Sequence, residues 1–308
     1  MSEATKIRLR ERKSQPRKSW FRPAKTEKGK WLRFYCCLAA VALVLFIAFF
    51  GKYFAPYDPL ATDYAAKLSA PGGSHLFGTD NVGRDVLSRI LYGAGNSFIL
   101  TFIMIAIVSV LGTVIGIVSG FFGGLLDTVI MRLTDILLAF PDTVFAIAIV
   151  GMMGPGLLNT VIALSFVWWT KYARMARGLA SVIRTKDYIT EARFGGVGTA
   201  GILFRYALPN IVPQVVIMAT LDVGGMMLAL AGLSFLGLAS QPPTPEWGYM
   251  LYEGKSYLQT APWIMLFAGL AIFITVIVFN LLGDSLRDIL DPKENWGPSL
   301  FIIGKRHR

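Results

Sequence analysis

Long apolar runs divide this chain of 308 residues, and they constrain its fold more than any other feature. Hydrophobic residues make up 54% of the sequence and charged residues only 16%, whereas about a quarter of an ordinary soluble domain is charged. The runs are about 17–25 residues long, which is enough to cross a bilayer hydrocarbon core of about 30 Å. The sequence therefore predicts an all-α integral membrane protein.

Six such runs predict six transmembrane helices, over residues 33–51, 98–120, 125–152, 157–180, 211–236 and 263–282. They divide the chain into a basic N-terminal tail (1–32), a first helix with an extracytoplasmic segment (33–97), a five-helix core (98–290) and a C-terminal tail (291–308). A polar loop, residues 187–209, interrupts the core between the fourth and fifth helices.

Lysine and arginine fall mostly on one side of the predicted helices. Twelve of the thirty lie within residues 1–33, and the loop after the fourth run adds Arg184, Lys186, Arg193 and Arg205. Short cytoplasmic segments retain such residues, and an even number of spans puts both termini on one side. Both termini and the polar loop are therefore predicted to be cytoplasmic.

The basic tail has two interpretations. It could bind anionic lipid, at about 1 kcal/mol for each basic residue near such a surface, or it could simply fix the topology. The second is favoured, because the positive-inside bias alone accounts for the charge. The first helix is expected to be a retained anchor, since no small-residue cleavage site follows it.

A metal site is not expected. Cys36 and Cys37 are adjacent inside the first run, where neighbours on one helix cannot supply a tetrahedral site. His75 has no second ligand nearby in the sequence.

The polar loop carries the signals of a short helical element. Asp187 is a plausible N-cap and Glu191 lies in the first turn, so a helix is predicted over 188–194. Gly195, Gly196 and Gly198 then permit a sharp turn.

A second helical piece is predicted over 200–207, ahead of Pro209, which disfavours helix at Leu208. The loop is longer and more structured than an ordinary connector. We therefore expect a helix–turn–helix at the cytoplasmic face that docks against another protein.

This loop resembles the cytoplasmic EAA signature of permease subunits in bacterial ABC importers. In that pattern Glu-Ala-Ala precedes a glycine, and Leu-Pro precedes the next span. Aligned on Gly196 and on Leu208-Pro209, Thr190 takes the place of the glutamate, while Glu191 and Ala192 take the places of the two alanines. The acid is displaced by one residue, which puts in doubt the specific salt bridge of the family's glutamate but not the docking.

Three further stretches narrow the resemblance. "HLFGTDNVGRDVLSRILYGAGNS", "LSFLGLASQPPTPEWGYML" and "NLLGDSLRDILDPK" resemble segments of dipeptide, oligopeptide and nickel permeases of the C type. The resemblance covers most of the chain after the basic tail.

The resemblance implies a type I, binding-protein-dependent permease in the bacterial inner membrane. Such a chain forms half of a translocation pathway, with a homologous second permease, two ABC ATPases and an extracytoplasmic solute-binding protein. ATP and magnesium would bind the ATPases. This chain is not expected to be an enzyme, because the sequence contains no G-x-x-x-x-G-K-[ST] phosphate loop.

The resemblance also suggests a substrate and a set of coupling residues. Small peptides are the expected cargo, with nickel or a metal chelate and glutathione-like compounds as alternatives. The residues expected to contact the ATPase are Tyr188, Thr190, Glu191, Ala192, Gly195, Gly196, Leu208 and Pro209.

Charged residues within or near the predicted spans are candidates for a gate or a substrate contact. Asp127, Arg132, Asp135 and Asp222 lie there, where a charge costs at least about 2.5–3.5 kcal/mol. Arg132 and Asp135 are three residues apart and could pair on one helix face. That pair is either a packing contact or part of a gate, and both roles stay open for Asp222.

On the outer side, Asp80, Arg84 and Asp85 lie in a loop that turns at Gly78 and Gly83. They either contact the solute-binding protein or cap the following helix.

Trp247, after the stiff segment "QPPTPE", is a second candidate contact of the binding protein. Its alternative is an anchor at the membrane interface.

Two other classes were weighed. An ion-driven secondary transporter would show inverted repeats around buried ionisable groups, and no repeat is obvious. A membrane-embedded enzyme would need convergent nucleophile, base or metal ligands, and none convene in the sequence.

Overall fold

A computed structural model describes residues 27–290, where the regular elements are helices and the only β pairing is an isolated bridge between Thr79 and Asp85. The helices are α2 (Glu27–Phe50), α3 (Val86–Phe122), α4 (Gly124–Leu138), α5 (Asp142–Met153), α6 (Leu157–Arg184), α7 (Asp187–Phe194), α8 (Thr199–Ile202), α9 (Leu208–Phe235), α10 (Trp247–Gly254) and α11 (Trp263–Leu290). Single turns of 3-10 helix cover Gly51–Tyr53, Tyr64–Ala66 and Lys255–Tyr257. The predicted C-terminal tail and most of the predicted N-terminal tail lie outside the described residues.

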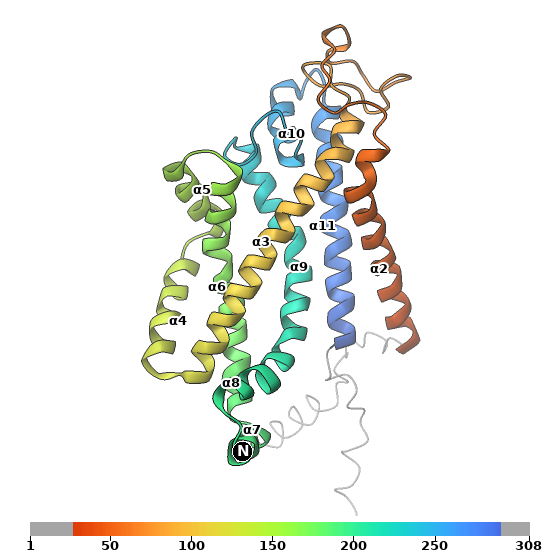
Figure 1. Cartoon of the computed structure of the whole chain (residues 1–308). Helices are drawn as coiled ribbons and strands as arrows, with labels where there is room; N and C mark the ends of the chain where they lie inside the picture. The colour runs from red at the N-terminus through yellow and green to blue at the C-terminus, as the bar shows by residue number, and fades with distance from the viewer. Residues whose placement is uncertain (1–26, 291–308) are drawn as a thin grey trace, which may run out of the picture.

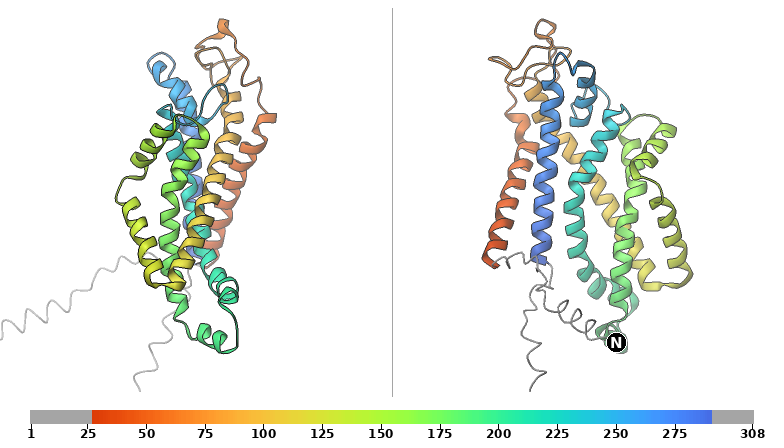
Figure 2. Two further views of the ribbon diagram at one scale, coloured as in Figure 1. Left: turned by 60° about the vertical axis from the view of Figure 1, so that its left-hand side comes forward. Right: turned by 180° about the vertical axis from the view of Figure 1, so that it is seen from behind.

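Long helices run side by side between two ends of the molecule (Figure 1). The start of α2 and the end of α11 lie at the same end as α7 and α8, and the opposite end carries α10 and the connection from α2 to α3 (Figure 2). The start of α2 and the end of α11 therefore lie at the same end of the molecule as the polar loop.

Four helices are long and apolar enough to cross a membrane: Lys28–Tyr53, Val86–Phe122, Thr199–Phe235 and Trp263–Leu290. The bent pair of α4 and α5 makes a fifth if it counts as one span. α6 is as long as α9, but it is amphipathic, with its basic residues toward its C-terminal half. A chain with several apolar helices of this length is a multi-pass membrane protein.

Two predicted spans differ from the observed helices. α3 begins at Val86, twelve residues before the predicted start at 98, because Asp85 caps its first turn. The predicted single span 125–152 is instead two helices at 89° to each other. Their junction precedes Pro141, which is the N-cap of α5 and has no N–H to continue a helix.

The approach to the fifth span also differs from the prediction, because Pro209 does not break the helix. A π-helical turn, Leu203–Ala207, connects α8 to α9. Pro209 lies in the first turn of α9, where its missing N–H costs no hydrogen bond.

The closest packing in the core is between α3 and α6. Gly112, Gly116 and Gly120 follow one another at intervals of four on α3. A Cβ atom built on each would lie 2.4, 2.3 and 2.4 Å from the carbonyl oxygens of Trp169, Ala173 and Arg177. Small residues at this spacing let two membrane helices approach closely. The sequence analysis missed this seam, although its spacing is visible in the sequence.

Candidate functional site

The polar loop forms a compact element at the end of the molecule that carries α7 and α8. α7 begins at Asp187 itself, and its N-cap is Lys186, which makes no side-chain capping bond, so Asp187 is not the predicted cap. Of the three glycines, only Gly196 has a positive φ, at +80°. The turn between α7 and α8 therefore depends on Gly196. We name residues 187–207 the coupling element.

One side of the coupling element packs against the chain's own long helices. Ile189 and Ile202 are fully buried against Ile117 and Phe121 of α3 and Ile183 of α6. Ala207 joins the same cluster, and the guanidinium of Arg193 lies 5.5 Å from the centre of the Phe121 ring. The element is therefore seated on α3 and α6 rather than hanging free of them.

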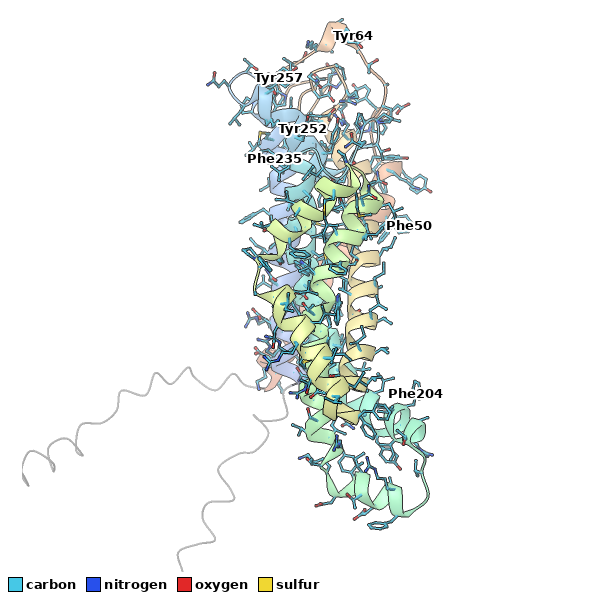
Figure 3. All side chains as sticks on the ribbon, turned by 90° about the vertical axis from the view of Figure 1, so that its left-hand side faces the viewer. Phe50, Tyr64, Phe204, Phe235, Tyr252 and Tyr257 are labelled. Carbon is cyan, nitrogen blue, oxygen red and sulfur yellow. The ribbon has the colours of Figure 1, made fainter. Side chains whose placement is uncertain are left out.

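The other side of the coupling element is open and aromatic. Phe194 is 89% exposed and Phe204 72% exposed, and Figure 3 shows Phe204 at this end of the molecule. Tyr188 is also exposed, with its ring 6.3 Å from that of Tyr206. Sequence reasoning missed Phe194 and Phe204, although large aromatic residues in a predicted solvent-facing loop are the signal that could have found them.

The eight predicted coupling residues divide between the two sides of the element. Ala192 is buried and Leu208 is half-buried, so these two shape the element from within. The remaining six are exposed: Tyr188, Thr190, Glu191, Gly195, Gly196 and Pro209. Thr190 and Glu191 lie side by side on the exposed part of α7, so an acid displaced by one residue still faces outward.

Three basic residues of α6 pair with three acids on other helices. The carboxylate of Asp127 on α4 accepts two hydrogen bonds from the Arg177 guanidinium, at 2.9 and 2.5 Å, and a third from the Ser119 hydroxyl at 2.5 Å. Arg174 donates to Asp135 at 2.6 Å. Two ion pairs therefore connect α4 to α6.

The predicted pair of Arg132 and Asp135 is wrong. Asp135 turns toward Arg174, and Arg132 makes no ion pair with any residue of the described range 27–290. Residues three apart on a helix are neighbours, but the Arg174 guanidinium on the facing helix α6 reaches the Asp135 carboxylate instead, at 2.6 Å.

Asp222 of α9 faces α6. Its Oδ1 lies 3.8 Å from the Lys171 ammonium, which in turn lies 3.5 Å from the centre of the Trp168 ring. The opposite carboxylate oxygen is buried and has no hydrogen-bond partner within the described part of the chain. Sequence reasoning could not give Asp222 a partner, because Lys171 lies on another helix.

At the opposite end, four charged side chains close a buried ring. Arg84 donates to Asp80 at 2.6 Å and to Glu253 at 2.7 Å, while Arg89 donates to the same Asp80 and, at 2.6 Å, to the second oxygen of Glu253. Arg89 and Asp80 are each 1% exposed. The ring fastens the segment before α3 to α10.

The predicted contacts of a binding protein lie inside this end of the molecule. Asp80, Arg84, Asp85 and Trp247 are all buried, so none offers its side chain at the surface. Asp85 instead caps α3, accepting from the Ser88 amide at 2.8 Å and from His75 Nδ1 at 2.9 Å. The alternative of helix capping is the correct one for Asp85.

Trp247 is neither a surface contact nor an interfacial anchor. Its indole N–H donates to the Ile90 carbonyl at 3.0 Å. The neighbouring Glu246 caps α10, accepting from the Gly248 and Tyr249 amides at 2.8 and 2.9 Å. Glu246 is 2% exposed, and burial raises the pKa of its carboxyl.

No three side chains of His, Cys, Asp or Glu among the described residues come close enough to hold a metal ion. Cys36 and Cys37 are both free thiols.

Comparison with known families gives a match over most of the helical core. A family model described as binding-protein-dependent transport system inner membrane component matches residues 112–295. The matched segment contains α4 to α11 and the whole coupling element.

Several curated proteins are similar over most of this chain. The dipeptide transport system permease protein DppC of Escherichia coli is 44% identical over 83% of this chain and 87% of its own length. The glutathione transport system permease protein GsiD of Pectobacterium atrosepticum is 41% identical over 86% and 89%. The nickel transport system permease protein NikC of Escherichia coli is 39% identical over 83% and 92%.

Among solved structures, the chain is similar to one from inward-facing conformations of the MetNI methionine ABC transporter. The TM-score is 0.54 at 18% sequence identity, covering 66% of this chain and 96% of that one. At this identity the likeness concerns the fold alone.

Proposed function

Because the chain belongs to the binding-protein-dependent transport system inner membrane components, we propose that it forms half of the transmembrane pathway of an ATP-driven importer. Its relatives are permease components, and it is itself a multi-pass permease of the inner membrane. Counting α6 and the bent pair of α4 and α5 as spans gives six crossings.

The coupling element carries this proposal. Only Thr185 and Lys186 separate it from α6, and Thr199–Phe235 runs as one helix from the element into α9. A force on the element therefore reaches both helices through the backbone. When two ATPase subunits close on ATP, a rigid element seated on one of them re-angles α6 and α9 and opens the pathway to the other side.

The energy source lies on partner subunits. The chain has no phosphate loop of its own, and the proposed partners are two ABC ATPases that bind ATP and magnesium. A homologous second permease completes the pathway, and an extracytoplasmic solute-binding protein delivers the cargo. With the ATPases in the cytoplasm, the start of α2 and the end of α11 are cytoplasmic as well, since they share the end of the coupling element (Figure 1).

Small peptides are the proposed cargo. The similarity to a dipeptide permease, at 44% identity, and to glutathione permeases, at 41% and 43%, supports a peptide-like substrate. Nickel or a metal chelate is the second candidate, because a nickel permease is 39% identical.

The charged residues of α4 and α9 remain candidates for the pathway. Asp222 is 18% exposed and Lys171 32% exposed, so their pair is accessible from one side of the contact between α6 and α9. We propose that Asp222 and Lys171 contact cargo or gate its passage. Asp135, paired with Arg174, would contribute by holding α4 in place.

Co-purification tests the proposal. The tagged permease is extracted in mild detergent with its partners, comparing wild type with Gly196→Asp and Phe194→Glu. The first forces an L side chain into a left-handed conformation, and the second places a charge on the exposed aromatic side. Both should lose the ATPases, while Tyr64→Glu, an exposed aromatic at the opposite end, should retain them.

If wild type brings down no ATPase, the importer assignment fails and an ion-driven transporter becomes the better explanation. If Phe194→Glu retains the ATPases as well as Tyr64→Glu does, coupling does not pass through this element.

A further inference from the structure

One face of α4 is exposed, apolar and interrupted by a single arginine. Leu125, Val129, Arg132 and Ile136 lie at intervals of four, three and four residues, so at 100° per residue they line one stripe along the helix. Leu125 is 85% exposed and Val129 66% exposed. We name these four residues the α4 seam. This spacing is that of a helix that packs along another helix.

The α4 seam points away from the buried side of α4, and Asp135, which pairs with Arg174, lies at the edge of the seam, about 60° around the helix from Arg132. Thr134 is fully buried and Asp127 is bonded to α6 and α3. Both lie on the opposite side of the helix from Arg132 by the same count of 100° per residue. The seam is therefore free for a partner.

The charges of α4 are unevenly matched. Its two acids, Asp127 and Asp135, are both engaged by arginines of α6, at 2.5 and 2.6 Å. Arg132 has no acidic partner among residues 27–290. An arginine on an apolar helix face in a membrane costs at least about 2.5–3.5 kcal/mol unless another group compensates it. The two acids of α4 are paired within the chain, so a carboxylate that compensates Arg132 would come from outside residues 27–290.

We propose that the α4 seam packs against a helix of the second permease subunit, and that this helix presents a carboxylate to Arg132. The inference rests on the proposed function, which supplies the partner. Lipid acyl chains would leave Arg132 uncompensated. A water-filled pathway would leave Leu125, Val129 and Ile136 against water at a cost in apolar surface. A protein helix with one acid satisfies both the charge and the apolar residues.

Photo-crosslinking in the full complex tests the seam. Benzoylphenylalanine replaces Val129, or in a matched control Leu43, an apolar residue of α2 that is 60% exposed. Val129 should crosslink to the second permease at least tenfold more than Leu43 does. Sequencing the crosslinked peptide identifies the facing helix, which should carry an aspartate or glutamate within one turn of the crosslink.

Charge reversal then tests the arginine. Arg132→Glu should lower the crosslink yield at Val129 at least tenfold, Arg132→Lys should stay within about threefold of wild type, and lysine in place of the partner's acid should restore the yield of Arg132→Glu. If Arg132→Glu does not accumulate, the neutral Arg132→Gln replaces it, with an expected loss of at least threefold.

Two results would overturn the inference: equal crosslinking at Val129 and Leu43, or a yield that does not respond to the charge at position 132. ATPase subunits counted in the same preparations keep the two proposals apart. If the ATPases are present but the seam does not crosslink, only the inference fails, whereas their absence from wild type removes the proposed function.

Discussion

The two ends of the molecule differ in how their charged and aromatic side chains find partners within the chain. The end with α10 closes its charges into the ring of Asp80, Arg84, Arg89 and Glu253 and buries Trp247 beneath them. In the coupling element, none of the described residues 187–207 forms an ion pair, and Phe194 is almost fully exposed. One end pairs these charges within the chain, although aromatic residues such as Tyr64 are exposed there too, while the other exposes aromatic residues without forming ion pairs.

This difference predicts that the α10 end contributes mainly to the stability of the chain and the coupling element mainly to docking. A buried ionic ring fixes one arrangement of the segments it joins, and removing one member leaves the others unpaired in a low dielectric. Exposed aromatic residues around a short helix instead mark a surface that another protein covers. Substitutions at the α10 end should therefore change the stability of the chain, and substitutions at the coupling element should change its assembly.

The largest expected effect is at the ring. Arg89→Leu leaves Asp80 and Glu253 each short of one buried partner, and we expect the free energy of unfolding to fall by about 3–5 kcal/mol. Denaturant unfolding in detergent micelles measures it. Arg33→Leu is the control, because its pair with Asp288 lies at the ends of α2 and α11, at 3.9 Å, with side chains 41% and 39% exposed. Its loss should stay within about 1 kcal/mol, and equal losses would remove the distinction between a buried ring and an exposed pair.

A smaller effect is expected at the seam of α3 and α6, which connects the two ends. Gly116→Ala places a methyl group 2.3 Å from the Ala173 carbonyl oxygen, so the two helices must move apart. We expect a loss of about 1–3 kcal/mol in the free energy of unfolding. Gly178→Ala on α6, where no heavy atom lies within 4 Å of the new carbon, should instead gain up to about 1 kcal/mol. Similar losses in both variants would mean that α3 and α6 are not in close contact.

The α10 end should also respond to pH through Glu246. Burial raises the pKa of this carboxyl above its ordinary value of 4.5, so the folded chain keeps a proton that the unfolded chain has already lost. As pH rises from 4.5 toward the raised pKa, the free energy of unfolding falls by up to about 1.4 kcal/mol for each pH unit.

The variant Glu246→Gln isolates this effect. The Gly248 and Tyr249 amides donate to different carboxylate oxygens in wild type, so the single amide oxygen of the variant keeps one of these bonds, and the side chain does not ionise. The stability of wild type relative to the variant should therefore be greatest near pH 4.5 and fall as pH rises. Parallel pH profiles would show that Glu246 does not titrate differently in the folded chain.

Apolar runs predicted the long helices well where the run and the helix have nearly the same bounds. The first, fifth and sixth predicted spans coincide with α2, α9 and α11, apart from their ends. α3 starts earlier than predicted because Arg89 and Ser88 are buried by pairing and capping. In the sequence, polar residues such as these are typical of a loop, because the partners that bury them inside a helix are not visible there. The bend between α4 and α5 was missed because the apolar composition continues across it, and only Pro141 marks the break.

The candidate site was predictable in outline and not in its contacts. The acidic and glycine-rich pattern of the loop predicted the short helices and the turn of the coupling element, because these signals are local. The partners of Asp127, Asp135 and Asp222 were not predictable, because each lies on α6 and a single sequence does not say which helices are neighbours. The side on which Phe194 emerges depends in the same way on how α7 is seated on α3 and α6.

The smallest expected effect on stability is at Phe194, and it gives the sharpest test of the comparison. Because the ring is 89% exposed, Phe194→Ala removes little buried surface, and the free energy of unfolding should change by no more than about 0.5 kcal/mol. If the ring instead fills a pocket of the ATPase, its removal should weaken that association by about 2 kcal/mol, or roughly 30-fold. Titration of the detergent-solubilised permease with purified ATPase measures the second quantity, and Tyr64→Ala at the α10 end, where the ring is 72% exposed, serves as the control. A variant that folds as well as wild type but binds the ATPase 30-fold more weakly would establish that this end is left open for a partner. Unchanged binding would mean that the exposed aromatic residues of the coupling element face something other than the ATPase.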